Sequence, residues 1–161
     1  MTIDFSDAAG APRQLTSAEV EAQFRALFQS EIVKSTHTAA SMSRQLGMTA
    51  RNLRRILNGE QKLCAAMLVD IGQVLGIDIM RATIAIARFG DWRAYGDATL
   101  IIAVDLLKPV VQMVNEQATI SLEPLHPKAI GQLSRWIAET VIKHQLELCA
   151  RREELDLGRR N

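Results

Sequence analysis

Residues 44–59 read RQLGMTARNLRRILNG. From Arg51 onward, three arginines and the asparagine at position 58 recur at helical spacing. On a helix that turns by about 100° per residue, these four side chains fall within one narrow arc, and the apolar residues Leu53, Ile56 and Leu57 fall on the opposite side. Guanidinium groups bind phosphate oxygens and match the O6 and N7 atoms of guanine. The stretch therefore predicts a helix that buries one face and presents cations and an amide on the other. The residues of that second face are Arg51, Arg54, Arg55 and Asn58.

Positive charge is concentrated around this stretch. The whole chain has a net charge of +1, but residues 34–62 hold six basic and one acidic side chain, which is a net charge of +5. A helix face that is merely solvated usually mixes both signs, and the predicted arginine helix contains no acidic residue. The segregation of charge favours a polyanionic partner for this face.

Capping residues divide the surrounding sequence into short helices. Thr38 precedes one helix that ends at Gly47, and Thr49 precedes the arginine helix, which Asn58 and Gly59 end. Apolar residues at helical spacing predict three further helices nearby. The five predicted helices cover residues 17–33, 39–46, 50–57, 65–75 and 79–89.

The order of these segments resembles the lambda-repressor-like, or Xre-type, helix-turn-helix family. The resemblance is carried by residues 38–76, TAASMSRQLGMTARNLRRILNGEQKLCAAMLVDIGQVLG, with its LGM, NG and VLG elements. With the flanking helices it covers residues 17–89, about half of the chain. It implies a five-helix DNA-binding domain in which the helix over 50–57 enters the major groove of double-stranded DNA.

The resemblance also implies which residues contact DNA. The family's base-reading positions fall on Ala50 and Arg51, with Arg54 one turn later. The family often has glutamine where this chain has Ala39 and Ala50, so we expect sequence specificity to shift to Arg51 and Arg54. The family's phosphate-contacting positions fall on Thr38, Ala39, Asn58 and Lys62. The complete predicted DNA-binding set is Thr38, Ala39, Thr49, Ala50, Arg51, Arg54, Arg55, Asn58 and Lys62.

The second half of the chain is more apolar. Residues 98–114 are apolar on almost every side, and a helix of this kind needs cover all round. The last predicted helix carries an apolar stripe as well. We therefore predict a homodimer formed through residues 97–156, with Pro109 kinking or splitting the first of these helices. The longest apolar run is interrupted by Asp105 and is shorter than the roughly 20 residues of a membrane span, so no membrane association is expected.

The expected protein is thus an all-α transcriptional regulator, most simply a repressor of bacterial or phage type. It would consist of a flexible lead-in (1–15), a helix-turn-helix domain (16–90) and a helical dimerisation region (91–161). No catalytic constellation, cofactor motif or metal-ligand cluster is visible, so enzymatic activity is not expected. No export signal is visible in the sequence, which suggests a cytoplasmic protein. The alternative is an antitoxin-like protein whose C-terminal half binds a partner protein and whose DNA binding serves autoregulation.

Overall fold

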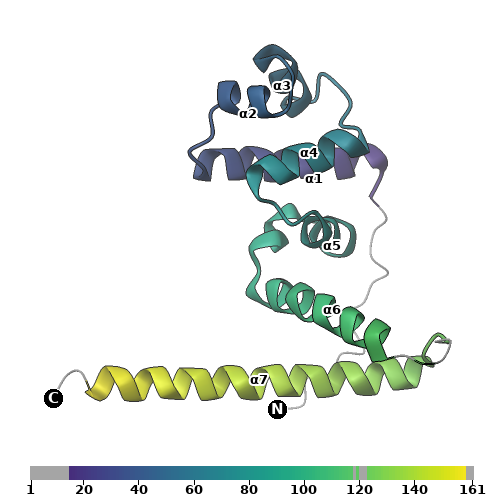
Figure 1. Cartoon of the computed structure of the whole chain (residues 1–161), viewed down its shortest axis with the longest axis vertical. Coiled ribbons are helices and arrows are strands. Elements are labelled where there is room, and N and C mark those ends of the chain that lie inside the picture. Colours follow the sequence, from purple (N-terminus) through teal and green to yellow (C-terminus); the bar gives the residue numbers. More distant parts are fainter. Residues whose placement is uncertain (1–14, 118, 120–122, 159–161) are drawn as a thin grey trace. The chain divides into compact units, whose positions relative to one another are not determined.

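A computed structural model of the chain describes residues 15–117, 119 and 123–158. The regular elements in these residues are all helices, which confirms the all-α class (Figure 1). They are α1 (Ser17–Lys34), α2 (Ala39–Gln45), α3 (Ala50–Leu57), α4 (Ala65–Leu75), α5 (Ile79–Phe89), the 3₁₀ helix η1 (Trp92–Gly96), α6 (Ala98–Gln117) and α7 (Pro127–Gly158). The chain divides into two compact units, residues 1–115 and 116–161. Of the predicted lead-in over 1–15, residues 1–14 lie outside the described part of the chain.

Helix α1 begins at a capping box that the sequence predicts correctly. The Thr16 hydroxyl accepts a hydrogen bond from the Glu19 N–H at 3.3 Å, and the Glu19 carboxylate accepts one from the Thr16 N–H at 2.8 Å. Together these bonds satisfy two backbone donors that a helix start leaves unpaired. The inner face of α1 carries Phe24, Leu27 and Phe28, all almost completely buried at the centre of the first core.

Helices α2 and α3 lie side by side at one end of the first unit, at the top of Figure 1. Gly47 has a φ of 63°, a left-handed conformation that most side chains avoid, and it turns the chain between the two helices. Thr49 then caps α3 by accepting a hydrogen bond from the Asn52 N–H at 3.2 Å. The predicted turn and cap are both confirmed.

The 3₁₀ helix η1, which the sequence analysis did not predict, ties α1 to α5. The Trp92 N–H donates to the Gln23 side-chain oxygen at 2.9 Å, and the Tyr95 hydroxyl accepts from the Asp78 N–H at 3.2 Å. The Arg81 guanidinium lies 4.0 Å from the centre of the Tyr95 ring, a favourable cation–π distance. The segment that joins α5 to α6 is therefore an ordered part of the first unit.

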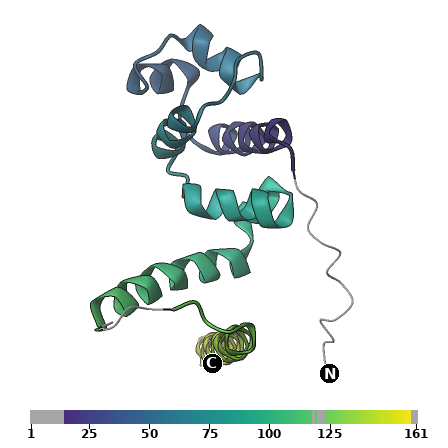
Figure 2. The same ribbon diagram turned by 90° about the vertical axis from the view of Figure 1, so that its right-hand side faces the viewer.

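Helix α6 also belongs mostly to the first unit. Leu100 and Val104 are buried against Ala85 of α5, and the Lys108 ammonium lies 2.6 Å from the Asp78 carboxylate. Figure 2 shows α5 between α1 and α6. Because these contacts continue past residue 90, the first compact unit includes η1 and most of α6.

Two expectations about α6 are corrected by its length. The helix runs unbroken for 20 residues with Pro109 inside it, so the proline does not split it, and a kink at Pro109 stays a prediction. By length and composition alone this helix could also cross a membrane, so the argument that the apolar run is too short does not hold. Its Asp105 and Lys108 lie near the middle of the helix, and Leu100 and Val104 are already covered by protein.

The second unit consists mainly of α7, a single helix of 32 residues. It extends further in both directions than the predicted apolar stripe. Helix α7 continues to Gly158, and residues 159–161 lie outside the described part of the chain.

Candidate nucleic-acid interface

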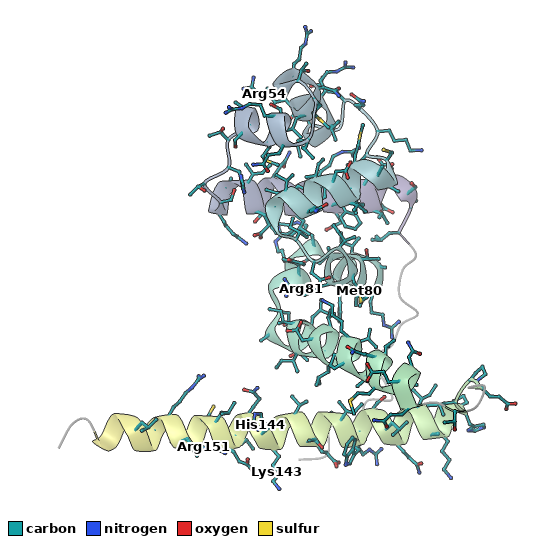
Figure 3. All side chains as sticks on the ribbon, viewed as in Figure 1. Arg54, Met80, Arg81, Lys143, His144 and Arg151 are labelled. Atoms are coloured by element: carbon teal, nitrogen blue, oxygen red, sulfur yellow. The ribbon has the colours of Figure 1, made fainter. Side chains whose placement is uncertain are left out.

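Helix α3 has one apolar face that packs into the core and one exposed face, as its sequence predicts, although Leu57 on the apolar face is only partly buried. Leu53 and Ile56 have no exposed surface and belong to the core formed with Phe28 of α1. On the other side, Arg51, Arg54, Arg55 and Asn58 are all exposed. Figure 3 labels Arg54 on α3, at the end of the first unit. Burial of the apolar side therefore fixes which side chains of α3 face outward.

Two of the three α3 arginines are unpaired within the part of the chain that the structure describes. The guanidinium groups of Arg51 and Arg54 form no hydrogen bond or ion pair with any described residue. The Arg55 Nε atom lies 3.6 Å from the Glu60 carboxylate, and both side chains are more than half exposed. An exposed pair of this kind is worth about 0–1 kcal/mol, so Arg55 can exchange Glu60 for another anion at little cost.

The start of α3 lies beside an open depression of about 540 Å³. Its walls come from the α2–α3 turn and the first turns of α3, and its lining residues are Gly47, Met48, Thr49, Arg51, Asn52 and Arg55. The positive end of the α3 dipole and two arginines contribute to this surface. The predicted positions Thr49, exposed, and Ala50, partly buried, both belong to this end of the helix.

The start of α2 presents the predicted residues Thr38 and Ala39. Thr38 is exposed, and its hydroxyl accepts a hydrogen bond from the Ser41 N–H at 3.1 Å. The Ser41 hydroxyl in turn accepts from the Thr38 N–H at 2.9 Å. Because a threonine hydroxyl is both donor and acceptor, the Thr38 O–H can still donate to an anionic oxygen while it caps the helix.

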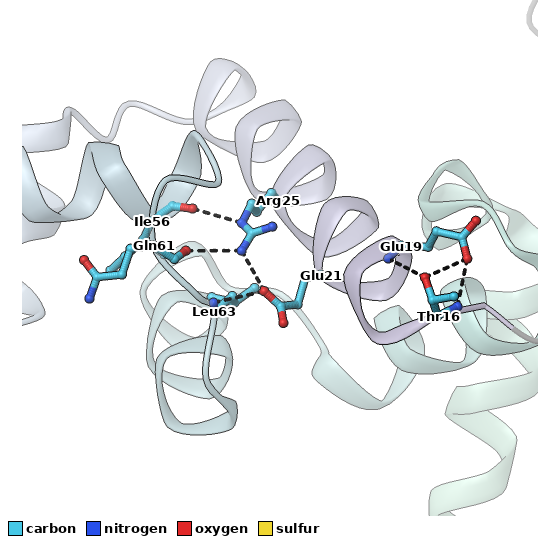
Figure 4. A network of polar contacts seen from close by, with 7 residues as sticks. All are labelled: Thr16, Glu19, Glu21, Arg25, Ile56, Gln61 and Leu63. Atoms are coloured by element: carbon cyan, nitrogen blue, oxygen red, sulfur yellow. Dashed lines mark hydrogen bonds and ion pairs between the residues drawn. The ribbon is translucent and has the colours of Figure 1, made fainter.

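A polar network on α1 holds the far end of α3, and sequence reasoning did not find it (Figure 4). The Arg25 Nε–H donates to the Ile56 carbonyl at 3.0 Å, and its Nη2 donates to the Gln61 carbonyl at 3.2 Å. The same Nη2 lies 2.7 Å from the Glu21 carboxylate, which also accepts the Leu63 N–H at 3.2 Å. The only signal in the sequence is the i, i+4 spacing of Glu21 and Arg25.

This network stabilises the C-terminal end of α3 and the loop that follows. A cation at a helix C-terminus interacts favourably with the helix dipole, and Arg25 supplies it from a neighbouring helix. Gln29 adds a hydrogen bond from its Nε2 to the Leu57 carbonyl at 2.9 Å. The pKa of Glu21 is lowered, first by the Leu63 N–H and then by Arg25, so the carboxylate stays ionised at neutral pH.

The loop held by Arg25 carries the remaining two predicted residues. Asn58 is the C-cap residue of α3 and Lys62 lies in the loop, and both are exposed. The nine residues expected at DNA therefore lie on three neighbouring segments of the first unit: the start of α2, α3, and the loop after α3. All belong to the region of net charge +5.

Other kinds of chemistry find no support among the described residues. Within that part of the chain no three His, Cys, Asp or Glu side chains come together in a way that could hold a metal ion. Cys64 and Cys149 are both exposed and unpaired with each other.

Comparisons of the chain with family models, with curated proteins and with solved structures found no match. The case for a function therefore depends on the interface around α3.

Proposed function

We propose that this protein is a sequence-specific DNA-binding transcriptional regulator that uses α3 as its recognition helix. The observation that carries the proposal is the state of Arg51 and Arg54. Both side chains are exposed and unpaired among the described residues, on a helix whose opposite face buries Leu53 and Ile56 completely. The position of the arginines is thus set by core packing while their guanidinium donors stay available for a ligand.

In this proposal α3 lies in the major groove. Arg51 and Arg54 donate to base edges, for which the O6 and N7 atoms of guanine are the best acceptors. The exposed side chains of Thr38, Asn58 and Lys62, on either side of α3, contact phosphates and set the orientation of the helix. The resemblance of residues 38–76 to the lambda-repressor-like family supports this division of roles.

We further propose that the regulator acts as a homodimer through residues 97–156 and represses by occupying promoter DNA. Helix α6 exposes a set of large apolar side chains, each between 39% and 54% accessible: Leu106, Leu107, Val110, Val111, Met113 and Val114. A second copy would cover them. A two-fold symmetric dimer binds half-sites whose centres lie about 34 Å apart, one turn of DNA.

Selection from a pool of random duplexes tests the proposal. We expect the full chain to enrich one two-fold symmetric sequence and the Arg51→Ala/Arg54→Ala variant to enrich none. Arg93→Ala, which removes an exposed cation outside the interface, should select the same sequence as the unmodified chain. A thermal melt of each variant separates loss of recognition from loss of folding. Failure of the unmodified folded chain to enrich any sequence would contradict the proposal.

The exposed apolar side of α6 also favours a second function, that of an antitoxin-like protein which binds a partner protein through its C-terminal half. In that case DNA binding would serve autoregulation. Sedimentation of the purified chain distinguishes the homodimeric regulator from the antitoxin-like protein. A soluble homodimer supports the regulator, and a chain that aggregates until a partner is co-expressed supports the antitoxin.

A further inference from the structure

Helix α7 carries a stripe of side chains at alternating spacings of four and three residues. Its members are Ile130, Ser134, Ile137, Val141, His144, Leu148, Arg151 and Leu155. Five of the eight are aliphatic. Ile130, Ile137 and Leu155 are 49%, 40% and 69% exposed, so the stripe lacks a full cover within the chain. Spacings of this kind place the stripe on the a and d positions of a coiled coil.

We propose that α7 pairs in parallel with α7 of a second copy of this chain, as a two-stranded coiled coil with this stripe as its seam. The inference deepens the homodimer of the proposed function, on which it rests. It names the helix that forms the interface, its direction and its register. Ser134, Val141, Leu148 and Leu155 occupy a positions, and Ile130, Ile137, His144 and Arg151 occupy d positions.

Charge complementarity favours the parallel arrangement. In this register Glu147 is at a g position and Arg152 is at the e position five residues later. In a parallel pair, a g residue lies beside the e residue five positions later on the partner helix. Glu147 of each copy therefore lies beside Arg152 of the other, which makes two attractive pairs. None of the remaining g–e pairs within residues 130–152 consists of two residues of like charge, so none of them opposes the pairing.

The polar members of the seam are compatible with this arrangement. The Arg151 guanidinium lies 3.9 Å from the Glu147 carboxylate one turn earlier, and the Arg151 side chain is 67% exposed. This ion pair draws Arg151 from the seam toward its rim, where its charge stays solvated. Ser134 and His144 interrupt the aliphatic seam, and polar seam residues specify register at some cost in stability. Figure 3 labels His144 and Arg151 on α7.

The proposed mode of DNA binding also favours the parallel direction. At about 1.5 Å per residue, the 32 residues of α7 span roughly 48 Å. An antiparallel pair would hold the N-terminal ends of the two helices about that far apart, whereas a parallel pair holds them together. A parallel pair therefore brings both chains in at the same end of the coiled coil, as half-sites about 34 Å apart favour.

Disulfide trapping in the full chain tests the pairing. Cys64→Ser and Cys149→Ser first remove both native thiols, and Ser134→Cys then places one thiol at a seam position with almost no change in size. Glu139→Cys, on the outer f position of the same helix, is the matched control. We expect mild oxidation to link the Ser134→Cys chains at least tenfold faster than the Glu139→Cys chains. In an antiparallel pair whose two seams overlap fully, Ser134 would lie beside the partner's Arg151. The Ser134→Cys chains would then form no disulfide with each other.

A charge exchange tests the register. Glu147→Arg places two arginines beside each other in both g–e pairs, and we expect the dimer dissociation constant to rise about fivefold. Glu147→Arg/Arg152→Glu restores opposite charges and should recover most of that loss. A double variant as weak as Glu147→Arg alone would overturn the register.

Sedimentation of the same proteins separates the outcomes. If the chain is a dimer but Ser134→Cys links no faster than Glu139→Cys, the α7 coiled coil is wrong and the dimer of the proposed function stands. A full chain that stays monomeric would overturn both.

Discussion

At the scale of single residues, the guanidinium groups of Arg51 and Arg54 differ from those of Arg25 and Arg55 in having no acceptor among the described residues. If they read bases, replacing either with alanine removes sequence information. We expect Arg51→Ala and Arg54→Ala each to cost about 1–3 kcal/mol on the selected operator and little on random duplex. Titrations of both variants on the two duplexes measure this difference. Equal losses on both would show that these arginines contact phosphate instead.

Lys62 should behave in the opposite way. It is exposed in the loop that Arg25 holds, next to the end of α3, and it is expected at a phosphate. Lys62→Ala should therefore weaken binding to operator and random DNA alike. The slope of log K against log salt should fall by about one unit, because one fewer counterion is released. Titrations at several salt concentrations provide the slope, with Arg93→Ala as the control expected to leave it unchanged.

At the scale of elements, the position of α3 depends on its buried face. Ile56 of α3 is fully buried in the core that also contains Phe28 of α1. Ile56→Ala should lower the free energy of unfolding by roughly 2–4 kcal/mol, because it removes buried methylene groups and leaves a cavity. Val69→Ala on the exposed side of α4 should change it by less than about 0.5 kcal/mol. Chemical denaturation of both variants checks this, and equal stabilities would place α3 elsewhere.

The network between α1 and α3 predicts a dependence of stability on acid. The pKa of Glu21 in the folded chain is lowered from its ordinary value of 4.5, by the Leu63 N–H and by Arg25. A lowered pKa contributes stability that is present above the unfolded value and is lost as the pH falls through the folded value. We expect the melting temperature to fall below about pH 4.5, with Asp78, whose pKa Lys108 lowers, adding to the loss at lower pH.

Substitution at Glu21 isolates its share of this effect. Glu21→Gln should lower stability at neutral pH and make the fall between pH 5 and 3 shallower, as thermal melts across this range would show. Glu60→Gln, which removes an exposed carboxylate from the same end of α3, should keep the steep fall. A Glu21→Gln profile parallel to that of the unmodified chain would contradict the role given to this network.

At the scale of the whole molecule, the boundary of the first unit decides where the chain can be shortened. A chain that ends after Asn115 keeps the contacts of Leu100 and Val104 with Ala85 and should melt as the first unit does, but without α7 it should dimerise more weakly than the full chain. A chain that ends at Gly90 lacks those contacts and the ties made by η1, and should be less stable. Sedimentation and thermal melts check both. A chain ending at Asn115 that dimerises as tightly as the full chain would place the dimer interface outside α7.

The sequence by itself determined those features that depend on residues within about four positions of one another. The caps at Thr16, Thr38 and Thr49 were predictable because a capping side chain bonds the backbone of its own first turn. The turn at Gly47 was predictable because few other residues adopt its φ. The two faces of α3 followed from helical periodicity, so the candidate interface was visible before any tertiary contact was known.

Only the tertiary structure decided the contacts between distant segments. Arg25 reaches a carbonyl 31 positions away, and a backbone carbonyl carries no mark in the sequence that would identify it as a partner. Leu100 and Val104 were visible as apolar, but their periodicity could not tell whether they would meet Ala85 or a second chain, since burial depends on apolar area and not on its source. For that reason the packing of α6 on α5, which brings most of α6 into the first compact unit, was not visible in the sequence.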